Sequence, residues 1–158
     1  MWLSYKDGEI AAFHPAFAEI GERVLKRLRL DGSHHWEHHP STAGVGVVPD
    51  FVLVDSSTGR WVLIVEIKRT PDAVGSERAQ IQAKGYAEAN KLNFVPGRPL
   101  YFAVSNLELT QLYAVRGDLP PRDCLIEGMA FDSGRFRSTP EGLHQATLEG
   151  DLITVVQF

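Results

Sequence analysis

The most distinctive pattern of apolar and polar positions in this chain lies between residues 47 and 70, which read VVPDFVLVDSSTGRWVLIVEIKRT. Two runs rich in β-branched residues, 51–54 and 61–65, stand on either side of the polar sequence SSTGR. Short apolar runs that flank a glycine-containing polar segment are typical of antiparallel strands joined by a turn. The pattern therefore predicts a β-hairpin near the centre of the chain.

Helical periodicity is found on both sides of this hairpin. In residues 13–30 the apolar side chains recur at intervals of three or four, which predicts a first helix with one buried face. The positions of this apolar stripe are Phe17, Ile20, Val24, Leu25 and Leu28. Residues 76–91 predict a second helix, in which Ser76 suits the N-cap and Glu77 the first turn.

Three more segments have the character of strands. Residues 33–39 predict a strand before the hairpin, and residues 100–104 and 109–115 predict two strands after the second helix. The predicted order is helix, three strands, helix and two strands. Because helices and strands alternate along the chain, this order indicates an α/β fold.

After residue 117 the pattern predicts two further strands, at 124–131 and 152–158, and so a β-rich C-terminal extension. We expect one domain over residues 1–158, with a core at about 13–116 and the extension at 117–158. The chain ends within an apolar stretch, which is unusual for a natural terminus. It is therefore either a small enzyme whose last strand docks on the sheet or a module of a longer protein.

Composition narrows the class of protein. The length of 158 residues and the hydrophobic content of 44% are typical of one globular domain. The sequence has no apolar run long enough to span a membrane and no signal peptide, and its single cysteine, Cys124, excludes an internal disulfide. We therefore expect a cytoplasmic domain. A net charge of −4 argues against a protein that coats nucleic acid, although basic clusters remain at 26–29, 68–69 and 135–137.

Charged residues interrupt the apolar pattern of the hairpin at Asp50, Glu66 and Lys68. Side chains alternate along a strand, so Glu66 and Lys68 share one face. If Asp55 and Trp61 face each other across the turn, Asp50 lies opposite Glu66. Opposed side chains are about 4.5–5.5 Å apart at Cβ, and like charges so placed destabilise a sheet. A divalent cation would offset this repulsion; the alternative is a hairpin with solvated charges at its ends.

The arrangement Pro49-Asp50 followed by Glu66-Ile67-Lys68 resembles the PD-(D/E)XK nuclease signature, here PD…EIK, carried on a hairpin between two helices. The pattern is most similar to the N-terminal domains of type I restriction enzyme R subunits and to RecB-like nuclease domains. Residues 105–107, SNL, replace the Thr-Asn-Gly turn of the former, so the match there is partial. The resemblance covers residues 13–116 and implies a restriction-endonuclease-like αβββαβ core, with helices on a mixed central sheet.

The resemblance also implies roles for these residues. Asp50 and Glu66 would bind Mg²⁺, for which Mn²⁺ could substitute, with the Ile67 carbonyl as a third ligand. Lys68 would orient the attacking water and stabilise the transition state. Members of the family often present a glutamate from the first helix, and the sequence GERVL is similar to this position in Holliday-junction resolvases. Glu22 is therefore expected to bind the metal directly or through water, with Glu19 as the alternative.

The second helix carries the sequence Q-x-x-x-Y, formed by Gln82 and Tyr86. Residues spaced i, i+4 lie on one helical face. The same pattern after an E-x-K strand is similar to that of RecB-like and type I restriction domains, and it implies that Gln82 positions the site or a phosphate. Gln80 is the possible substitute. The structural alternative is a half-buried tyrosine beside a polar residue.

Residues 33–39, read SHHWEHH, also suggest zinc. On a strand, alternate residues face opposite sides, so neither face offers more than three close ligands, and no cysteine is near. We therefore expect a strand edge that contacts phosphate or solvent, with a structural zinc site as the alternative.

Together these observations predict a Mg²⁺-dependent deoxyribonuclease that hydrolyses DNA phosphodiester bonds, as a restriction-type endonuclease domain. The expected partners are DNA and either a second copy of the chain or further restriction or helicase domains, with no membrane. The alternative is a catalytically inactive nucleic-acid-binding module of the same fold. The sequence leaves open DNA or RNA as the substrate, endonuclease or exonuclease cutting, and the oligomeric state.

Overall fold

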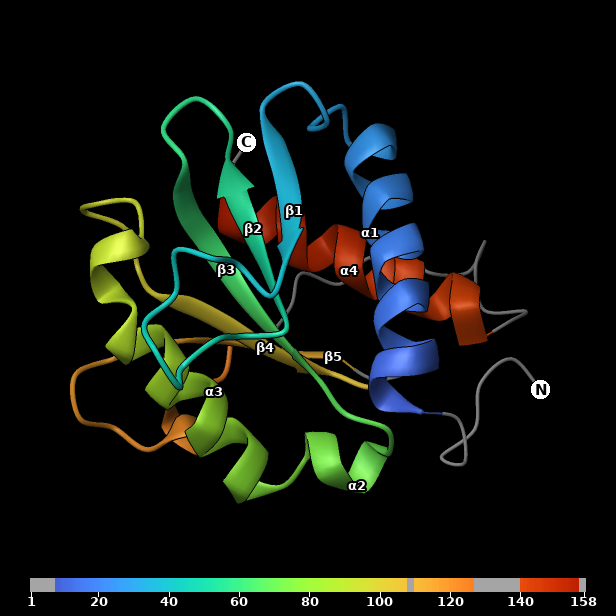
Figure 1. Cartoon of the computed structure of the whole chain (residues 1–158). Coiled ribbons are helices and arrows are strands. Elements are labelled where there is room, and N and C mark those ends of the chain that lie inside the picture. The colour runs from blue at the N-terminus through green and yellow to red at the C-terminus, as the bar shows by residue number, and fades with distance from the viewer. Residues whose placement is uncertain (1–7, 108–109, 127–139, 157–158) are drawn as a thin grey trace.

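A five-stranded mixed sheet forms the centre of the computed structural model, which describes residues 8–107, 110–126 and 140–156 (Figure 1). The strands are β1 (His34–His38), β2 (Phe51–Asp55), β3 (Arg60–Ile67), β4 (Tyr101–Ser105) and β5 (Thr110–Ala114). Their order in the sheet is their order in the chain, and β3 and β4 pair in parallel while the other neighbours are antiparallel. The predicted strands of the core are confirmed.

Helices cover both faces of this sheet. The first face carries α1 (His14–Arg27), which follows a π-helical turn at Glu9–Phe13, and α4 (Pro140–Val156); the second carries α3 (Glu77–Ala89) (Figure 1). A short helix, α2 (Pro71–Val74), precedes α3 in the connection from β3 to β4. A parallel strand pair requires such a crossover, so the second helix is a consequence of the sheet topology.

Each face has its own hydrophobic core. On the first face, Phe17 and Ile20 of α1 belong to one buried cluster with Phe51 and Val65 of the hairpin. On the second face, the fully buried side chains that α3 contributes to the cluster are Ala79, Ala83 and Ala87, and Tyr86 packs against it half-buried. Because alanine is short, the axis of α3 can lie close to the sheet. Ser76 caps this helix as predicted, since its Oγ accepts a hydrogen bond from the backbone N–H of Ala79 at 3.2 Å.

The turn of the hairpin differs from the assumed register. Asp55 pairs with Arg60 and Val54 with Trp61, whereas the sequence analysis took Asp55 to face Trp61. The turn closes through Gly59, which has φ +71°, a conformation that glycine adopts without steric cost. This alternative turn alone would displace every later pair by one residue.

A β-bulge corrects that displacement. The register shifts between Val54 and Leu53, so that Leu53 pairs with Leu63 and Val62 is the extra residue in β3. Val62 and Leu63 are consecutive, yet both lie in the core on the first face, as expected where two residues oppose one. Beyond the bulge the register runs as predicted, and Asp50 lies beside Glu66.

The predicted β-rich C-terminal extension is wrong where the structure describes it. Residues 152–156 belong to α4, whose buried positions Leu148, Leu152 and Val155 follow helical spacing. A short apolar run cannot distinguish a strand from a buried helix by periodicity alone. Of the other predicted strand, 124–131, Leu125 forms an isolated bridge with Tyr113, and residues 127–131 lie outside the described residues.

Among the residues that the structure describes, no helix combines the length and the apolar character that a membrane crossing requires.

Candidate functional site

The carboxylates of Asp50 and Glu66 are adjacent at the end of the hairpin that lies away from its turn. The backbone N–H of Asp50 donates to Glu66 Oε1 at 3.0 Å, and the backbone N–H of Ile67 donates to Asp50 Oδ2 at 2.7 Å. Each carboxylate is therefore held by the backbone of the neighbouring strand. This reciprocal arrangement fixes both side chains and agrees with the predicted opposition of the two charges.

The environment of Glu66 is unfavourable to its charge. The residue is only 3% exposed. Burial, followed by the nearby Asp50 carboxylate, raises the pKa of Glu66 to about 8, and the charge of Lys68 acts in the opposite direction. A buried carboxylate is costly unless it is paired or binds a metal. The pair is thus a set of oxygen donors of the kind that hard divalent cations bind.

Lys68 joins this pair to α3. Its backbone N–H donates to the Ser105 carbonyl at 2.8 Å, which extends the pairing of β3 with β4 by one residue. Its Nζ donates to Gln82 Oε1 at 3.1 Å, and Gln82 Nε2 donates to the Tyr86 hydroxyl at 3.1 Å. The predicted common face of Gln82 and Tyr86 is confirmed. A pocket of about 550 Å³ opens here, lined by both Lys68 and Gln82.

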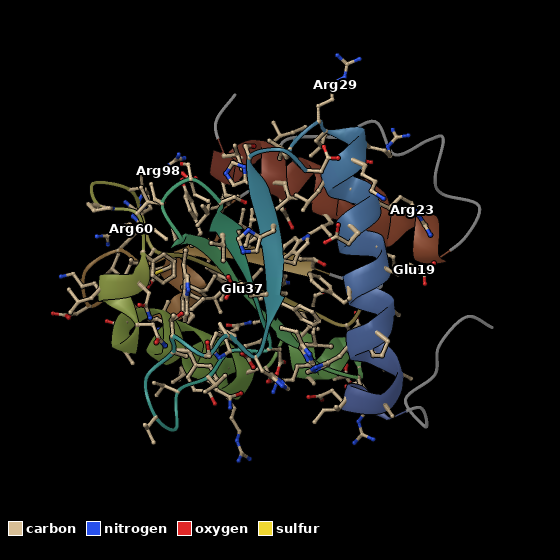
Figure 2. All side chains as sticks on the ribbon, turned by 45° about the horizontal axis from the view of Figure 1, so that its top comes forward. Glu19, Arg23, Arg29, Glu37, Arg60 and Arg98 are labelled. Carbon is tan, nitrogen blue, oxygen red and sulfur yellow. The ribbon has the colours of Figure 1, made fainter. Side chains whose placement is uncertain are left out.

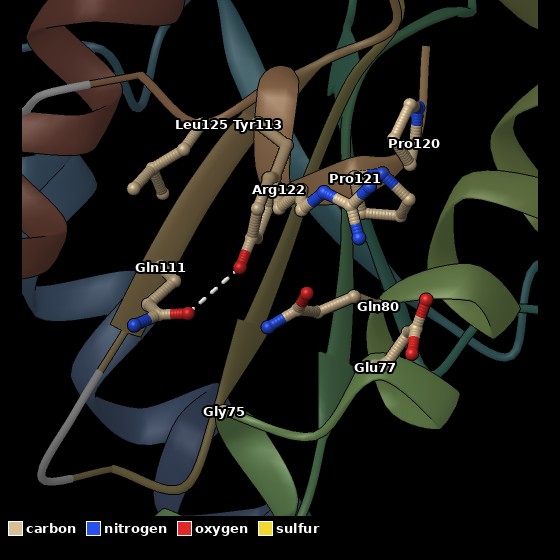
Figure 3. Close-up of a pocket in the computed structure, with 9 residues that line it drawn as sticks. All are labelled: Gly75, Glu77, Gln80, Gln111, Tyr113, Pro120, Pro121, Arg122 and Leu125. Atoms are coloured by element: carbon tan, nitrogen blue, oxygen red, sulfur yellow. Dashed lines mark hydrogen bonds between the residues drawn. The ribbon is translucent and has the colours of Figure 1, made fainter. Parts of the chain in front are cut away.

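Gln80 lies elsewhere. It lines a separate pocket of about 340 Å³ between α3, β5 and the 3₁₀ turn Pro121–Asp123, where it faces Gln111 and Tyr113 (Figure 3). In this pocket the Tyr113 hydroxyl donates to Gln111 Oε1 at 2.7 Å. The structure therefore brings Gln82, and not Gln80, to the lysine.

The structure does not bring Glu22 to the carboxylate pair. Gly21 lies on the buried face of α1, where a Cβ at this position would be 2.8 Å from Trp36 Nε1. Successive helical residues are about 100° apart, so Glu22 turns away and is exposed. The alternative, Glu19, is also exposed and pairs with Arg23 at 3.3 Å on the outer side of α1 (Figure 2).

Other residues at the start of α1 lie near Asp50 instead. His14 Nε2 is 3.6 Å from Asp50 Oδ2, and His39 Nε2 is 3.8 Å from Asp50 Oδ1. Glu9 has a carboxylate oxygen within 4.8 Å of ligand atoms of both His14 and Asp50. Burial raises the pKa of Glu9, and the charge of Asp50 contributes in the same direction. The sequence analysis missed Glu9 and His14, because their proximity depends on where α1 begins relative to β1.

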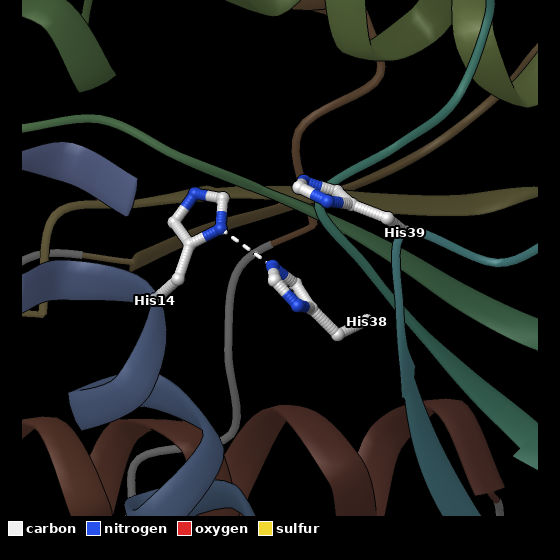
Figure 4. A group of neighbouring side chains, drawn as sticks. All are labelled: His14, His38 and His39. Carbon is white, nitrogen blue, oxygen red and sulfur yellow. Dashed lines mark hydrogen bonds between the residues drawn. The ribbon is translucent and has the colours of Figure 1, made fainter. Parts of the chain in front are cut away.

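The histidines of residues 33–39 divide into two groups. His34 and His35 contact serines near the turn, at Ser33 and Ser56, over 2.8 and 2.7 Å. His38 and His39 lie at the other end of β1, beside His14 (Figure 4). Burial lowers the pKa of both His14 and His38. β1 is an edge strand and both His38 and His39 are exposed, as expected, but their grouping with His14 was not predicted.

Two of the predicted basic clusters can be placed. Residues 68–69 lie at the site just described, whereas in residues 26–29 Arg27 donates from Nε to Glu149 of α4. Residues 135–137 lie outside the described residues. Lys68 thus brings positive charge next to the carboxylate pair.

Comparison with known proteins places this chain in a family. A similar solved structure is that of the type IIG restriction endonuclease BpuSI, with a TM-score of 0.80 and 25% sequence identity; the match covers 97% of this chain and 17% of that chain. No curated protein matches the sequence. The family described as the BpuSI N-terminal domain matches residues 3–129, which is most of the chain. The protein therefore belongs to the family of BpuSI N-terminal domains and is a domain related to restriction enzymes.

Proposed function

We propose that this domain is a Mg²⁺-dependent deoxyribonuclease, a restriction-type endonuclease of the PD-(D/E)XK superfamily that hydrolyses DNA phosphodiester bonds. The observation that carries the proposal is the adjacency of Asp50 and Glu66, with Lys68 directly after β3 and hydrogen-bonded to Gln82. The relation to the restriction endonuclease BpuSI supports DNA as the substrate. BpuSI is a much longer protein, and the cleavage activity proposed here would belong to the part of it that this chain matches.

The donor set fits Mg²⁺. Asp50 and Glu66 supply two carboxylates, and the Ile67 carbonyl lies between Glu66 and Lys68 in the chain, where it would complete the protein's ligands. Mg²⁺ usually takes one or two carboxylates and retains several waters. Burial and the Asp50 carboxylate raise the pKa of Glu66, and a bound cation would act on it in the opposite direction, as Lys68 does. When bound, the metal would lower the pKa of a coordinated water and neutralise charge on the phosphate.

Lys68 and Gln82 would supply the remaining chemistry. Lys68 is half-buried and its ammonium is held by Gln82, so its direction is fixed before substrate binds. A preorganised cation stabilises negative charge that develops on a phosphate oxygen, and it does so without a reorganisation cost. Gln82 is held in turn by Tyr86. These residues therefore position one another, and the pocket that Lys68 and Gln82 line would receive a backbone phosphate.

Glu22 has no place in this proposed site, because it is exposed on α1. Glu9 is the carboxylate from the N-terminal segment that lies near Asp50. We propose Glu9 as the residue that contacts the metal directly or through water. It occupies the role that the family resemblance gave to a glutamate of the first helix.

The proposal extends to partners. Cleavage of both DNA strands is favoured by two sites, so restriction-type activity favours a homodimer or association with further restriction or helicase domains. The chain spans 17% of the BpuSI chain that it matches. We propose that the domain functions beside such further domains.

A cleavage assay tests this function. The purified chain is incubated with Mg²⁺ or Mn²⁺ and with plasmid, linear or branched DNA. We expect cleavage that depends on the metal and is lost in Asp50→Ala, Glu66→Ala and Lys68→Ala. Asp55→Asn is the matched control, because Asp55 lies at the other end of the same strand and is satisfied locally by Ser57.

Two outcomes would contradict the proposal. Cleavage by Asp50→Ala at the wild-type rate, with contaminating nuclease excluded, would remove Asp50 from the mechanism. DNA binding without cleavage under any of these metal conditions would favour the alternative, a non-catalytic module of the same fold.

A further inference from the structure

Three histidine rings meet at the N-terminal end of α1, next to the carboxylate pair. His14 begins α1, His38 ends β1 and His39 follows it. One ring nitrogen from each lies within 4.8 Å of the others. Figure 4 shows the three rings facing one another, with His14 Nδ1 hydrogen-bonded to His38 Nε2 at 2.8 Å. Because the ligands come from two elements far apart in the chain, only the fold assembles this group.

His14 is the fixed member of the group. It is 2% exposed, and its Nε2 has no hydrogen-bond partner among the residues described. This nitrogen points toward Asp50, whose Oδ2 lies 3.6 Å away, beyond hydrogen-bond distance. His14 therefore presents its other ring nitrogen, Nδ1, to the histidine group, where it meets His38 Nε2, while Nε2 faces the carboxylate pair.

His39 is held in a conformation that brings it to the same side as its neighbour. Its φ is +46°, which few residues other than glycine adopt, although histidine and asparagine are enriched there. Consecutive residues of a regular strand face opposite sides of the sheet. Here the rings of His38 and His39 stack instead, with centroids 3.9 Å apart, and Phe51 packs on His38 with a centroid separation of 4.7 Å.

These dimensions suit a tetrahedral ion with nitrogen ligands. For a Zn–N bond of about 2.0–2.1 Å, tetrahedral geometry places neighbouring nitrogens about 3.3 Å apart. The 2.8 Å contact between His14 and His38 would therefore open slightly as the ion replaces the shared proton. His38 and His39 are exposed and can make this adjustment while His14 stays in place. Imidazole ligands favour zinc, copper and nickel, whereas Mg²⁺ favours oxygen.

We propose that His14, His38 and His39 bind a divalent transition-metal ion of the zinc class, and that this ion inhibits the neighbouring Mg²⁺ site. Asp50 is the link, because it lies within 4 Å of both His14 and His39. A zinc-class ion held by the histidines would attract the Asp50 carboxylate and draw it away from Glu66. Repulsion between two nearby dications adds to this effect. The binding of the ion stands on the histidines alone, whereas the inhibition rests on the proposed nuclease function.

Binding is tested on the full chain with Co²⁺, whose visible absorption reports a tetrahedral nitrogen site, and with Zn²⁺ as competitor. His39→Asn and His38→Asn each remove one ligand without burying a new group, and asparagine tolerates the positive φ at position 39. Loss of even an indirect partner of a metal site weakens binding by about 10- to 100-fold. We therefore expect at least a 100-fold loss of Co²⁺ affinity in either variant. His35→Asn is the matched control, because His35 lies on the same strand but bonds Ser56 and Glu37.

Coupling is tested in two ways. Mg²⁺ at millimolar concentration should weaken Co²⁺ binding, since coupling between two sites is reciprocal. Zn²⁺ should inhibit Mg²⁺-dependent DNA cleavage by the wild type and by His35→Asn. The same inhibition should require far more Zn²⁺ in His39→Asn, with each protein compared with its own rate in Mg²⁺ alone.

The outcomes separate the two proposals. Wild-type protein that binds no Co²⁺, or His39→Asn that binds it as tightly as wild type, overturns the histidine site. Co²⁺ affinity that is unchanged by Mg²⁺ overturns the coupling. If the wild type cleaves no DNA in Mg²⁺ but still binds Co²⁺ through His38 and His39, the nuclease proposal fails and the metal site stands.

Discussion

Lys68 Nζ donates a hydrogen bond to Gln82 Oε1 at 3.1 Å, and this contact connects the end of β3 to the exposed face of α3. If Lys68 acts on a phosphate, Gln82 sets its direction. Gln82→Ala should then reduce the rate of DNA cleavage by about 10- to 100-fold, since small displacements of a catalytic group have effects of this size. The melting temperature should hardly change, because Gln82 is exposed.

The matched control for this variant is Gln80→Ala on the same helix. Gln80 lines the other pocket, beside Gln111 and Tyr113. Equal loss of activity in the two variants would show that Gln82 acts through α3 as a whole and not through Lys68.

Glu9 and Glu22 provide a second matched pair. Glu9→Gln should raise the Mg²⁺ concentration needed for half-maximal cleavage, because Glu9 lies near Asp50. Glu22→Gln should leave this concentration unchanged, because Glu22 is exposed on α1. The measurement is a Mg²⁺ titration of the cleavage rate for each variant. If Glu22→Gln raised this Mg²⁺ concentration and Glu9→Gln did not, Glu22 would be the metal ligand, as the sequence pattern predicts, and Glu9 would not.

Without metal, Glu66 should destabilise the folded protein at alkaline pH. Burial, together with Asp50, raises the pKa of Glu66 from 4.5 to about 8. Between these values the folded protein holds a proton that the unfolded chain has released, so the contribution of Glu66 to stability falls as pH rises. Glu66→Gln should therefore melt higher than wild type above pH 8, by on the order of 5 °C, with the difference vanishing toward pH 4.5. Thermal melts in EDTA across this range make the measurement.

Mg²⁺ provides the control for that measurement. It should stabilise the wild type and narrow the gap in melting temperature to Glu66→Gln, because the proposed Mg²⁺ site requires both carboxylates. If the wild type instead melted higher than Glu66→Gln above pH 8 in EDTA, the charge of Glu66 would already be compensated within the protein.

Asp151 of α4 should also lower the stability of the folded protein as pH rises, independently of Glu66. Burial raises the pKa of Asp151 from 3.8 to about 7, and its Oδ2 has no hydrogen-bond partner among the described residues. The contribution of Asp151 to stability therefore falls as pH rises from 3.8 to 7. Asp151→Asn should raise the melting temperature above pH 7 while DNA cleavage is unchanged. The effects of Asp151→Asn and Glu66→Gln should add, since the two residues lie on different elements.

The sequence predicts the hairpin and its carboxylate pair because that information is local. Asp50 and Glu66 interrupt apolar strands, and a mismatch between a charge and its expected environment is visible without a structure. Gln82 and Tyr86 were predictable for the same reason, since their spacing alone places them on one helical face. Only the contact of Gln82 with Lys68 depends on the packing of α3 against the sheet.

Other features depend on how elements pack against one another. Glu22 was placed on the wrong side because the apolar stripe of α1 does not show that Gly21 contacts Trp36. The histidine cluster was missed because His14 is 24 residues from His38 in the chain. The C-terminal helix was taken for a strand because its apolar residues form a run without a polar face.

The bulge at Val62 has a consequence for how this family can vary. The extra residue changes the pairing only between Leu53 and the turn. The end of the hairpin that holds Asp50 and Glu66 lies on the other side of the bulge and keeps its register. A relative that lacks the residue at position 62 could form a regular hairpin from the same turn and still oppose these two carboxylates. A relative that lost one residue on the other side of the bulge would misalign them. In an alignment of homologous sequences, a one-residue gap should therefore occur next to Trp61 but not between Leu63 and Glu66. The number of residues between Asp50 and Glu66 is then expected to vary by one, while the two carboxylates remain opposed.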